Sequence, residues 1–146
     1  MIRSINRTLY RTATQTPAVN AILSVLVRTL IAGVYVGAGI SKIFNYAGTE
    51  QYMAHMGVPG ALLPLVIFVE VAGGLALIAG FMTRLAALGL AIFSVIAAVI
   101  FHSGGDQTQQ TFFMMNLSMT GGLLALVLNG AGRASFDRGD RTSLPE

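Results

Sequence analysis

Four polar side chains that could do chemistry lie inside or beside long apolar stretches of this sequence. They are Arg28, Lys42, Glu70 and Asn116. Glu70 is the only ionisable residue in the apolar stretch 62–81, and it lies near the middle of that stretch. A charged, unpaired carboxylate at the centre of a membrane helix costs roughly 2.5–3.5 kcal/mol. Glu70 therefore needs a proton, a cationic partner or a wet cavity.

Arg28 is the cation that we expect to pair with Glu70. Counted from the ends of their apolar stretches, both residues lie about 13–16 Å from the same side of a membrane. A guanidinium can bind a carboxylate through two hydrogen bonds and offset both desolvation costs. We therefore predict an Arg28–Glu70 ion pair. In the alternative, Arg28 extends its side chain to the membrane surface and leaves Glu70 without this partner.

The remaining polar side chains predict a pocket. One stripe of the first helix, about 60° wide, is polar; it holds Arg28, Tyr35, Gly39 and Lys42. On the last apolar stretch, Asn116 and Thr120 share a helical face. We predict that Lys42, Glu70 and Asn116 line a polar pocket open to the outer side, and that Arg28 belongs to the same ligand-binding or buried polar site. The alternative for Asn116 is a hydrogen bond that bridges two helices.

Two pairs of glycines predict close helix packing. Gly33 and Gly37 form a GxxxG pattern opposite the polar stripe. This pattern suits packing against a helix of this chain, our preferred interpretation, or against a second copy in a homo-oligomer. Gly73 and Gly74 lie one helical turn after Glu70, where they let a neighbouring backbone approach. The alternative is that they leave room for a ligand.

Composition excludes several classes of site. The chain has no cysteine, which excludes disulfides, thiolate catalysis and cysteine-bound metal clusters. His55, His102 and Asp106 have no metal-binding spacing, so we predict no metal site. The formal net charge of +3 does not indicate nucleic-acid binding, because the basic residues lie at the ends of apolar stretches, where they determine membrane topology.

Four apolar stretches must position these side chains: 19–40, 62–81, 85–101 and 112–128. Each approaches the roughly 20 residues that a membrane-spanning helix needs. Only 10% of the 146 residues are charged, which is too few for a soluble surface. The sequence therefore predicts an all-α integral membrane four-helix bundle. We divide the chain into an N-terminal segment, 1–16, a transmembrane domain, 17–130, and a cytoplasmic tail, 131–146.

The N-terminal segment has the pattern of a short basic amphipathic helix. Its apolar and its basic residues each recur at helical spacing. The apolar residues are Ile2, Ile5 and Leu9, and the basic residues are Arg3, Arg7 and Arg11. Such a helix lies on an anionic membrane surface. The alternative is a frayed, solvated terminus whose positive charge only sets the topology.

The distribution of basic residues predicts the orientation of the chain. Four crossings put both termini on one side, and seven basic residues fall on that side: Arg3, Arg7, Arg11, Arg84, Arg133, Arg138 and Arg141. Only Lys42 falls on the other side. The positive-inside rule then places both termini in the cytoplasm, with the protein in a bacterial inner membrane and the connections 41–60 and 102–111 outside.

Several short motifs occur in order between residues 27 and 138. They are Arg28, Gly33, Tyr35, Gly37, Gly39, Ser41 and Lys42; Met56-Gly57-Val58-Pro59; Glu70-x-x-Gly73-Gly74; Gly80-Phe81-Met82-Thr83-Arg84; Asn116; Gly121-Gly122; and Gly130-Ala131-Gly132-Arg133-Ala134-Ser135-Phe136-Asp137. This ordered set resembles the DoxX family of small bacterial inner-membrane proteins, many of which carry a lysine where this chain has Met115. The resemblance implies a four-helix membrane protein.

The resemblance also implies a function, because the family name comes from a subunit associated with quinone-linked thiosulfate oxidation. We predict an accessory or membrane-anchor component of a quinone-linked redox system or an oxidative-stress system, not an enzyme on its own. Its expected partners are membrane lipid and a protein of such a complex, and its candidate ligand is a quinone. Two alternatives stay open: a non-enzymatic membrane assembly or stress protein, and a small-solute carrier.

Overall fold

All regular secondary structure in the described part of the chain is helical. The computed structural model describes residues 1–137, with the side chains of residues 2 and 3 excepted. The helices are α1 (Ile2–Gln15), α2 (Pro17–Phe44), α3 (Tyr46–His55), the 3₁₀ helix η1 (Gly60–Leu62), α4 (Leu63–Ala79), α5 (Thr83–His102) and α6 (Gln107–Asn129). Four helical segments are long and apolar enough to cross a membrane: α2, η1 with α4, α5, and α6. The predicted all-α architecture with four spans is confirmed.

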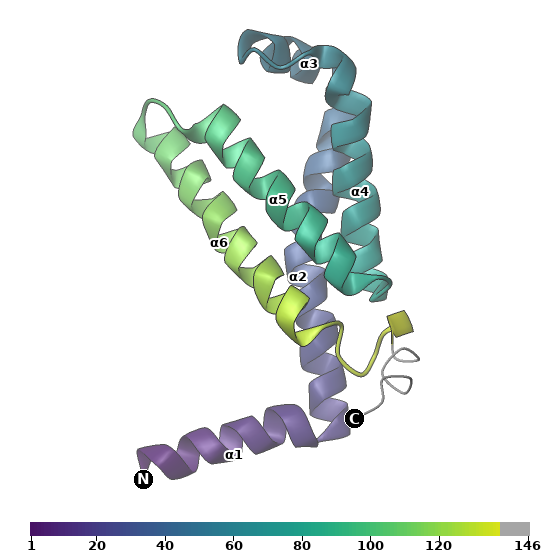
Figure 1. Cartoon of the computed structure of the whole chain (residues 1–146), viewed down its shortest axis with the longest axis vertical. Helices are drawn as coiled ribbons and strands as arrows, with labels where there is room; N and C mark the ends of the chain where they lie inside the picture. Colours follow the sequence, from purple (N-terminus) through teal and green to yellow (C-terminus); the bar gives the residue numbers. More distant parts are fainter. Residues whose placement is uncertain (138–146) are drawn as a thin grey trace.

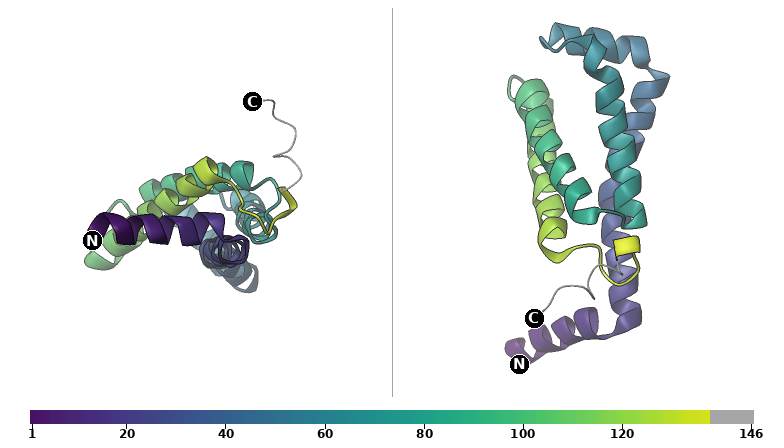
Figure 2. Two further views of the ribbon diagram at one scale, coloured as in Figure 1. Left: turned by 90° about the horizontal axis from the view of Figure 1, so that it is seen from below. Right: turned by 45° about the vertical axis from the view of Figure 1, so that its right-hand side comes forward.

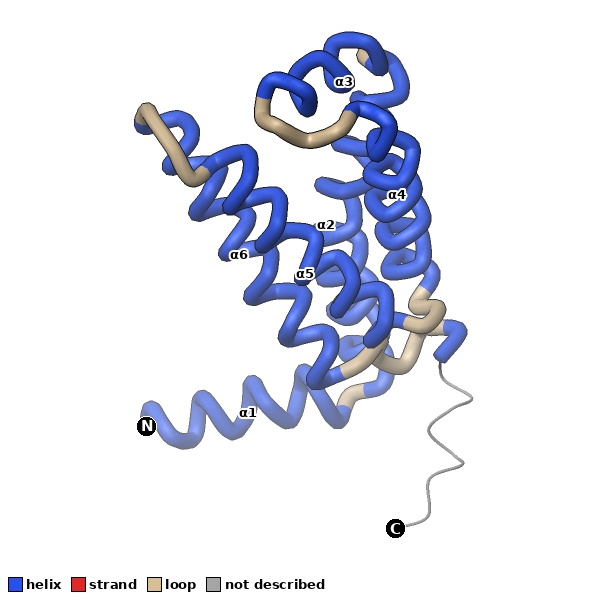
Figure 3. Tube along the Cα trace, turned by 45° about the horizontal axis from the view of Figure 1, so that its top comes forward, coloured by secondary structure: helices blue, strands red, loops and turns tan. Residues whose placement is uncertain are grey.

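The four long helices form two antiparallel pairs, α2 with α4 and α5 with α6 (Figure 1). A tight turn at Gly80, which has φ +68°, joins α4 to α5, so both pairs meet at one end, here called the base. From the base the pairs diverge, and α3 lies across the wide end (Figures 2 and 3). The core lies where the pairs meet, and its buried residues are Ala32, Tyr35, Leu77, Ala87, Leu90, Ala91, Leu123 and Leu126.

Glycines set the contact between α2 and α4. A Cβ built on Gly39 would come within 2.6 Å of Val71 Cγ2, and one built on Gly74 would come within 2.6 Å of Val36 Cγ2. Gly73 faces the other way, where its Cβ would lie 3.1 Å from Leu90 Cγ on α5. The predicted close packing after Glu70 is therefore confirmed.

The GxxxG pattern behaves differently. A Cβ built on Gly33 or Gly37 would meet no atom within 4 Å, and both glycines are exposed. The prediction that they pack inside the bundle is wrong. The reason is the direction of the polar stripe: Arg28, Tyr35 and Gly39 are the buried face of α2, so the opposite face points away from the other helices.

A shorter helix flanks α2 at each end, α1 before it and α3 after it. The sequence predicted an external connection over 41–60, but α2 continues to Phe44 and α3 fills most of the remainder after Asn45. A turn follows α3, with Gly57 at φ +78°. At the other end, α1 is a helix that runs at a large angle to α2 (Figure 1). The Asn20 Nδ2 group stabilises this corner by donating to the Ala13 carbonyl over 3.2 Å.

Some of the sequence predictions fall on parts that the structure does not describe. They are the side chains of Ile2 and Arg3 in the amphipathic pattern, and Arg138 and Arg141 in the charge asymmetry. The contact of α1 with a membrane surface stays a prediction.

Candidate functional site

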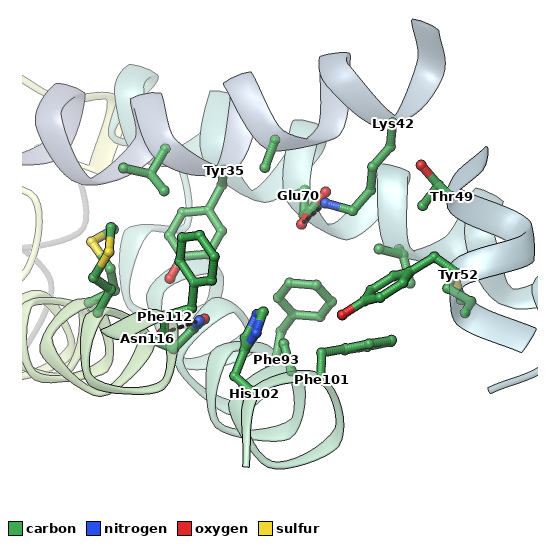
Figure 4. A pocket seen from close by; sticks show the side chains of 17 residues that line it. Tyr35, Lys42, Thr49, Tyr52, Glu70, Phe93, Phe101, His102, Phe112 and Asn116 are labelled. Atoms are coloured by element: carbon green, nitrogen blue, oxygen red, sulfur yellow. Dashed lines mark hydrogen bonds and ion pairs between the residues drawn. The ribbon is translucent and has the colours of Figure 1, made fainter. Parts of the chain in front are cut away.

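A cavity of about 420 Å³ lies between the two helix pairs, at the end where they diverge (Figure 4). Helices α2 to α6 all contribute to its walls. The walls are largely aromatic and aliphatic, and the aromatic side chains are Tyr35, Tyr52, Phe93, Phe101 and Phe112. Tyr52 stacks on Phe101 with ring centroids 5.6 Å apart, which connects α3 to α5. The size and apolar lining are those of a site for a small organic molecule.

Lys42 and Glu70 form the charged part of this cavity. Lys42 Nζ donates to Glu70 Oε1 over 2.8 Å. The Glu70 side chain is 5% exposed and the Lys42 side chain 26%, so the pair lies on the wall with its cation closer to solvent or headgroups. The long lysine side chain lets an ammonium at the end of α2 reach the carboxylate on α4. Of the three ways to accommodate a buried Glu70, the structure therefore shows a cationic partner.

The partner is not the one that we predicted. Arg28 makes no contact with Glu70; its guanidinium donates to the carbonyls of Leu77 and Ile78, over 3.2 and 3.1 Å, and to the carbonyl of Ala134. The prediction of an Arg28–Glu70 pair is wrong because the glycine contacts fix the register of α2 on α4. Gly39 lies beside Glu70, so Arg28, three turns earlier, reaches the C-terminal end of α4.

Arg28 is buried at the base, where it holds a C-terminal segment that we call the clasp, residues 130–137. The last carbonyls of a helix lack intrahelical donors, and a cation there also complements the helix dipole. Arg28 serves this role for α4 and ties Ala134 of the clasp to it. The Arg28 side chain of α2 thus joins the end of α4 to the clasp, and this contact closes the base.

Asp137 ends the clasp at the N-terminus of α5. Its carboxylate accepts from the backbone N–H groups of Met82 and Thr83, both over 2.8 Å. Burial alone would raise the pKa of Asp137, but the hydrogen bonds from Thr83 and Met82 and the charge of Arg28 outweigh burial and lower this pKa. The aspartate acts as an N-terminal cap supplied from a distant part of the chain.

The lowered pKa of Asp137 makes the stability of the folded protein depend on pH. A carboxyl with a depressed pKa in the folded state stabilises the protein above its unfolded pKa of about 3.9, and this contribution is lost as the pH falls through the folded pKa. We expect Asp137→Asn to lower the melting temperature at neutral pH. The variant should also lose less of its melting temperature than the parent protein when the pH falls below about 4. Thermal unfolding in detergent at a series of pH values measures both effects. Parallel acid profiles for the two proteins would contradict this role of Asp137.

The structure brings three of the four predicted site residues to one cavity. Lys42, Glu70 and Asn116 line it, whereas Arg28 lies at the base. Asn116 does not bridge helices, because its Nδ2 group donates to the Phe112 carbonyl of its own helix. Thr120 Oγ1 likewise donates to the Asn116 carbonyl of its own helix.

Sequence reasoning missed the aromatic walls and one hydrogen bond inside the bundle. Tyr35 Oη and Ser94 Oγ lie 2.5 Å apart in a buried contact between α2 and α5. The spacing of Phe93, Ala97 and Phe101 is a signal that was present, because residues four apart share a helical face. No sequence pattern indicated which face of α5 turns toward the cavity.

Comparison with known proteins identifies the family. The DoxX family model matches residues 23–103. The inner membrane protein YqjF of Escherichia coli (strain K12) is 47% identical over 112 residues, which cover 76% of this chain and 86% of that protein. The inner membrane protein YphA of the same strain is 31% identical over 129 residues, which cover 83% and 92%. No solved structure matches the chain. With its four apolar spans, the chain belongs to the DoxX family and is a multi-pass membrane protein like its inner-membrane relatives.

Proposed function

We propose that the chain binds a quinone, or a ring of similar size and polarity, in the cavity between the helix pairs. The observation that carries this proposal is the charged pair of Lys42 with Glu70 on the wall of a largely aromatic and aliphatic cavity. A quinone matches this distribution, because it has a flat apolar ring and polar oxygens at the ring edge. The flat faces of Phe93 and Phe112 suit stacking against such a ring.

The residues divide the recognition between them. Lys42 has N–H groups left after its bond to Glu70 and would donate to a ring oxygen. Asn116 presents its side-chain amide from α6, on the other helix pair. Electron transfer to quinones is carried by cofactors, so we propose that a partner protein supplies the electrons. In this role the chain is the quinone-binding membrane component of a redox system.

A tryptophan reporter tests the binding. The chain has no tryptophan, so Phe93→Trp places one indole in the cavity wall. Ile92→Trp is the matched control, because Ile92 is the next residue on α5, is 54% exposed and lines no part of the cavity. We expect a short-chain benzoquinone to quench the tryptophan fluorescence of Phe93→Trp saturably. The fluorescence of Ile92→Trp should be quenched only in proportion to the benzoquinone concentration in the detergent phase.

The outcome separates the competing functions. If the saturable quenching of Phe93→Trp is lost when Lys42→Met is added, the result would support Lys42 as the group that binds a ring oxygen. Proportional quenching in both tryptophan variants would contradict quinone binding. It would then favour a non-enzymatic assembly protein, in which the Lys42–Glu70 pair serves only to hold α2 and α4 in register.

We also propose that the base faces the cytoplasm. Among the described residues, α1, the start of α5 and the clasp lie toward the base (Figure 1), and they hold Arg7, Arg11, Arg84 and Arg133. Lys42 belongs to the other end of α2. Since the chain has no cysteine, Thr8→Cys and Thr49→Cys each introduce one reactive thiol. We expect a membrane-impermeant maleimide to label Thr49→Cys in intact cells and Thr8→Cys only after permeabilisation. Labelling of both positions from outside would contradict this orientation.

A further inference from the structure

The carboxylate of Glu70 uses only one of its two oxygens. Oε1 accepts from Lys42, but Oε2 is buried and has no hydrogen-bond partner among the described residues. Glu70 as a whole is 4% exposed and belongs to the cavity wall. A buried carboxylate oxygen without a donor is costly, because the water that would have bonded to it is gone. The site is therefore short of one hydrogen-bond donor.

No donor of the described cavity wall reaches the second oxygen of Glu70. The Tyr35 and Ser94 hydroxyls bond to each other, and Asn116 Nδ2 donates within its own helix. His102 Nδ1 is paired with Gln109 Oε1 over 2.7 Å. None of these groups reaches Glu70 Oε2. A donor from a bound molecule is the complement that this oxygen lacks.

We propose that the ligand donates a hydroxyl hydrogen to Glu70 Oε2, so that the cavity prefers a hydroxyl-bearing ring, a quinol or phenol, over the corresponding quinone. This inference rests on the proposed function of the cavity and names the form of the ring. A quinol O–H donates to Oε2, and its oxygen accepts a free N–H of Lys42. A quinone carbonyl only accepts, so it bonds to Lys42 but leaves Oε2 without a donor.

The test compares one ring in three forms on the Phe93→Trp protein. They are a short-chain benzoquinone, its two-electron-reduced quinol kept under nitrogen, and the dimethyl ether of that quinol. The quinone affinity is read directly from saturable quenching, and the other two affinities from displacement of the quinone. We expect the quinol to bind about 10-fold more tightly than the quinone, as for a hydrogen bond to a charged group. The ether keeps the ring and loses both donors, so we expect it to bind no better than the quinone.

The two proposals fail in different ways. Saturable quinone binding with a quinol that is no tighter, or with an ether as tight as the quinol, would overturn the donor inference and leave the proposed function standing. Absence of saturable binding by every form would overturn both. Glu70→Gln provides a second measurement, because a neutral amide paired with Lys42 no longer demands an external donor. We expect the quinol preference to shrink to within about 3-fold in this variant, and an unchanged preference would also count against the inference.

Discussion

Replacing Lys42 with methionine is expected to destabilise the bundle by about 3 kcal/mol, the low end of the cost of breaking a buried ion pair. The substitution leaves Glu70 as a lone charge on the wall of an apolar cavity. We choose the low end because the Lys42 side chain is 26% exposed and part of its charge is already solvated. The free energy of unfolding in detergent, measured by titration with a denaturing surfactant, gives the size of the effect.

A double-mutant cycle shows whether the cost belongs to the pair. Glu70→Gln alone should destabilise the protein less, because the ammonium of Lys42 can turn toward solvent. Lys42→Met with Glu70→Gln should recover much of the loss, since no lone charge remains, with a coupling of about 1–3 kcal/mol. The matched control combines Glu70→Gln with Arg28→Met, whose effects should add because the two residues do not touch. Additive effects for Lys42 and Glu70 would contradict the pairing.

Loss of the Arg28 guanidinium is the second change with a large expected effect. Arg28→Met leaves the carbonyls of Leu77, Ile78 and Ala134 without this donor in a buried part of the base. A hydrogen bond to a charged group contributes about 1.5–3 kcal/mol, so we expect a loss of about 3 kcal/mol or more. Arg28→Lys should not restore it, because one ammonium cannot reproduce the planar fork that reaches α4 and the clasp together.

Glycine substitutions test the same packing without changing charge. Gly80 has φ +68°, and a Cβ built on it would collide with the Arg28 guanidinium and with Ser135. Gly80→Ala should therefore lower the melting temperature strongly. Gly37→Ala is the matched control, because its Cβ would enter open space and its backbone is helical. Equal effects of the two alanines would show that the base is not closed as tightly as the structure indicates.

Much of the fold could be predicted from the sequence, because hydrophobic length and helical period are local properties. The four spans and the buried stripe of α2 follow from them. The expectation that the charge of Glu70 must be neutralised or solvated also follows, since it depends only on depth. The identity of its cationic partner does not, because it depends on how α2 slides along α4. That register is set by the contacts of Gly39 and Gly74, which are far apart in the sequence.

The clasp could not be predicted for a different reason. The segment 130–137 is short, rich in glycine and alanine and without periodicity, so no local signal indicates that it returns to the base. The glycines in the segment indicate a turn, as the positive φ of Gly130 and Gly132 confirms, but not its destination. The partner of Asp137 is the start of α5, about 54 residues away in the chain. Only the folded arrangement shows this connection.

The length of α2 has a consequence for the dependence of the protein on its bilayer. At about 1.5 Å per residue, its 28 residues span roughly 40 Å, close to the full thickness of a bilayer with its headgroups. Helices α1 and α3 lie crosswise at its two ends (Figure 1). We expect this arrangement to oppose sliding of α2 along the membrane normal. A thinner bilayer must then be matched by tilting α2. Because α3 is attached to α2 while Phe101 and Phe112 belong to the other helix pair, tilting would alter the mouth of the cavity. Ligand affinity should therefore vary with the acyl-chain length of the surrounding lipid.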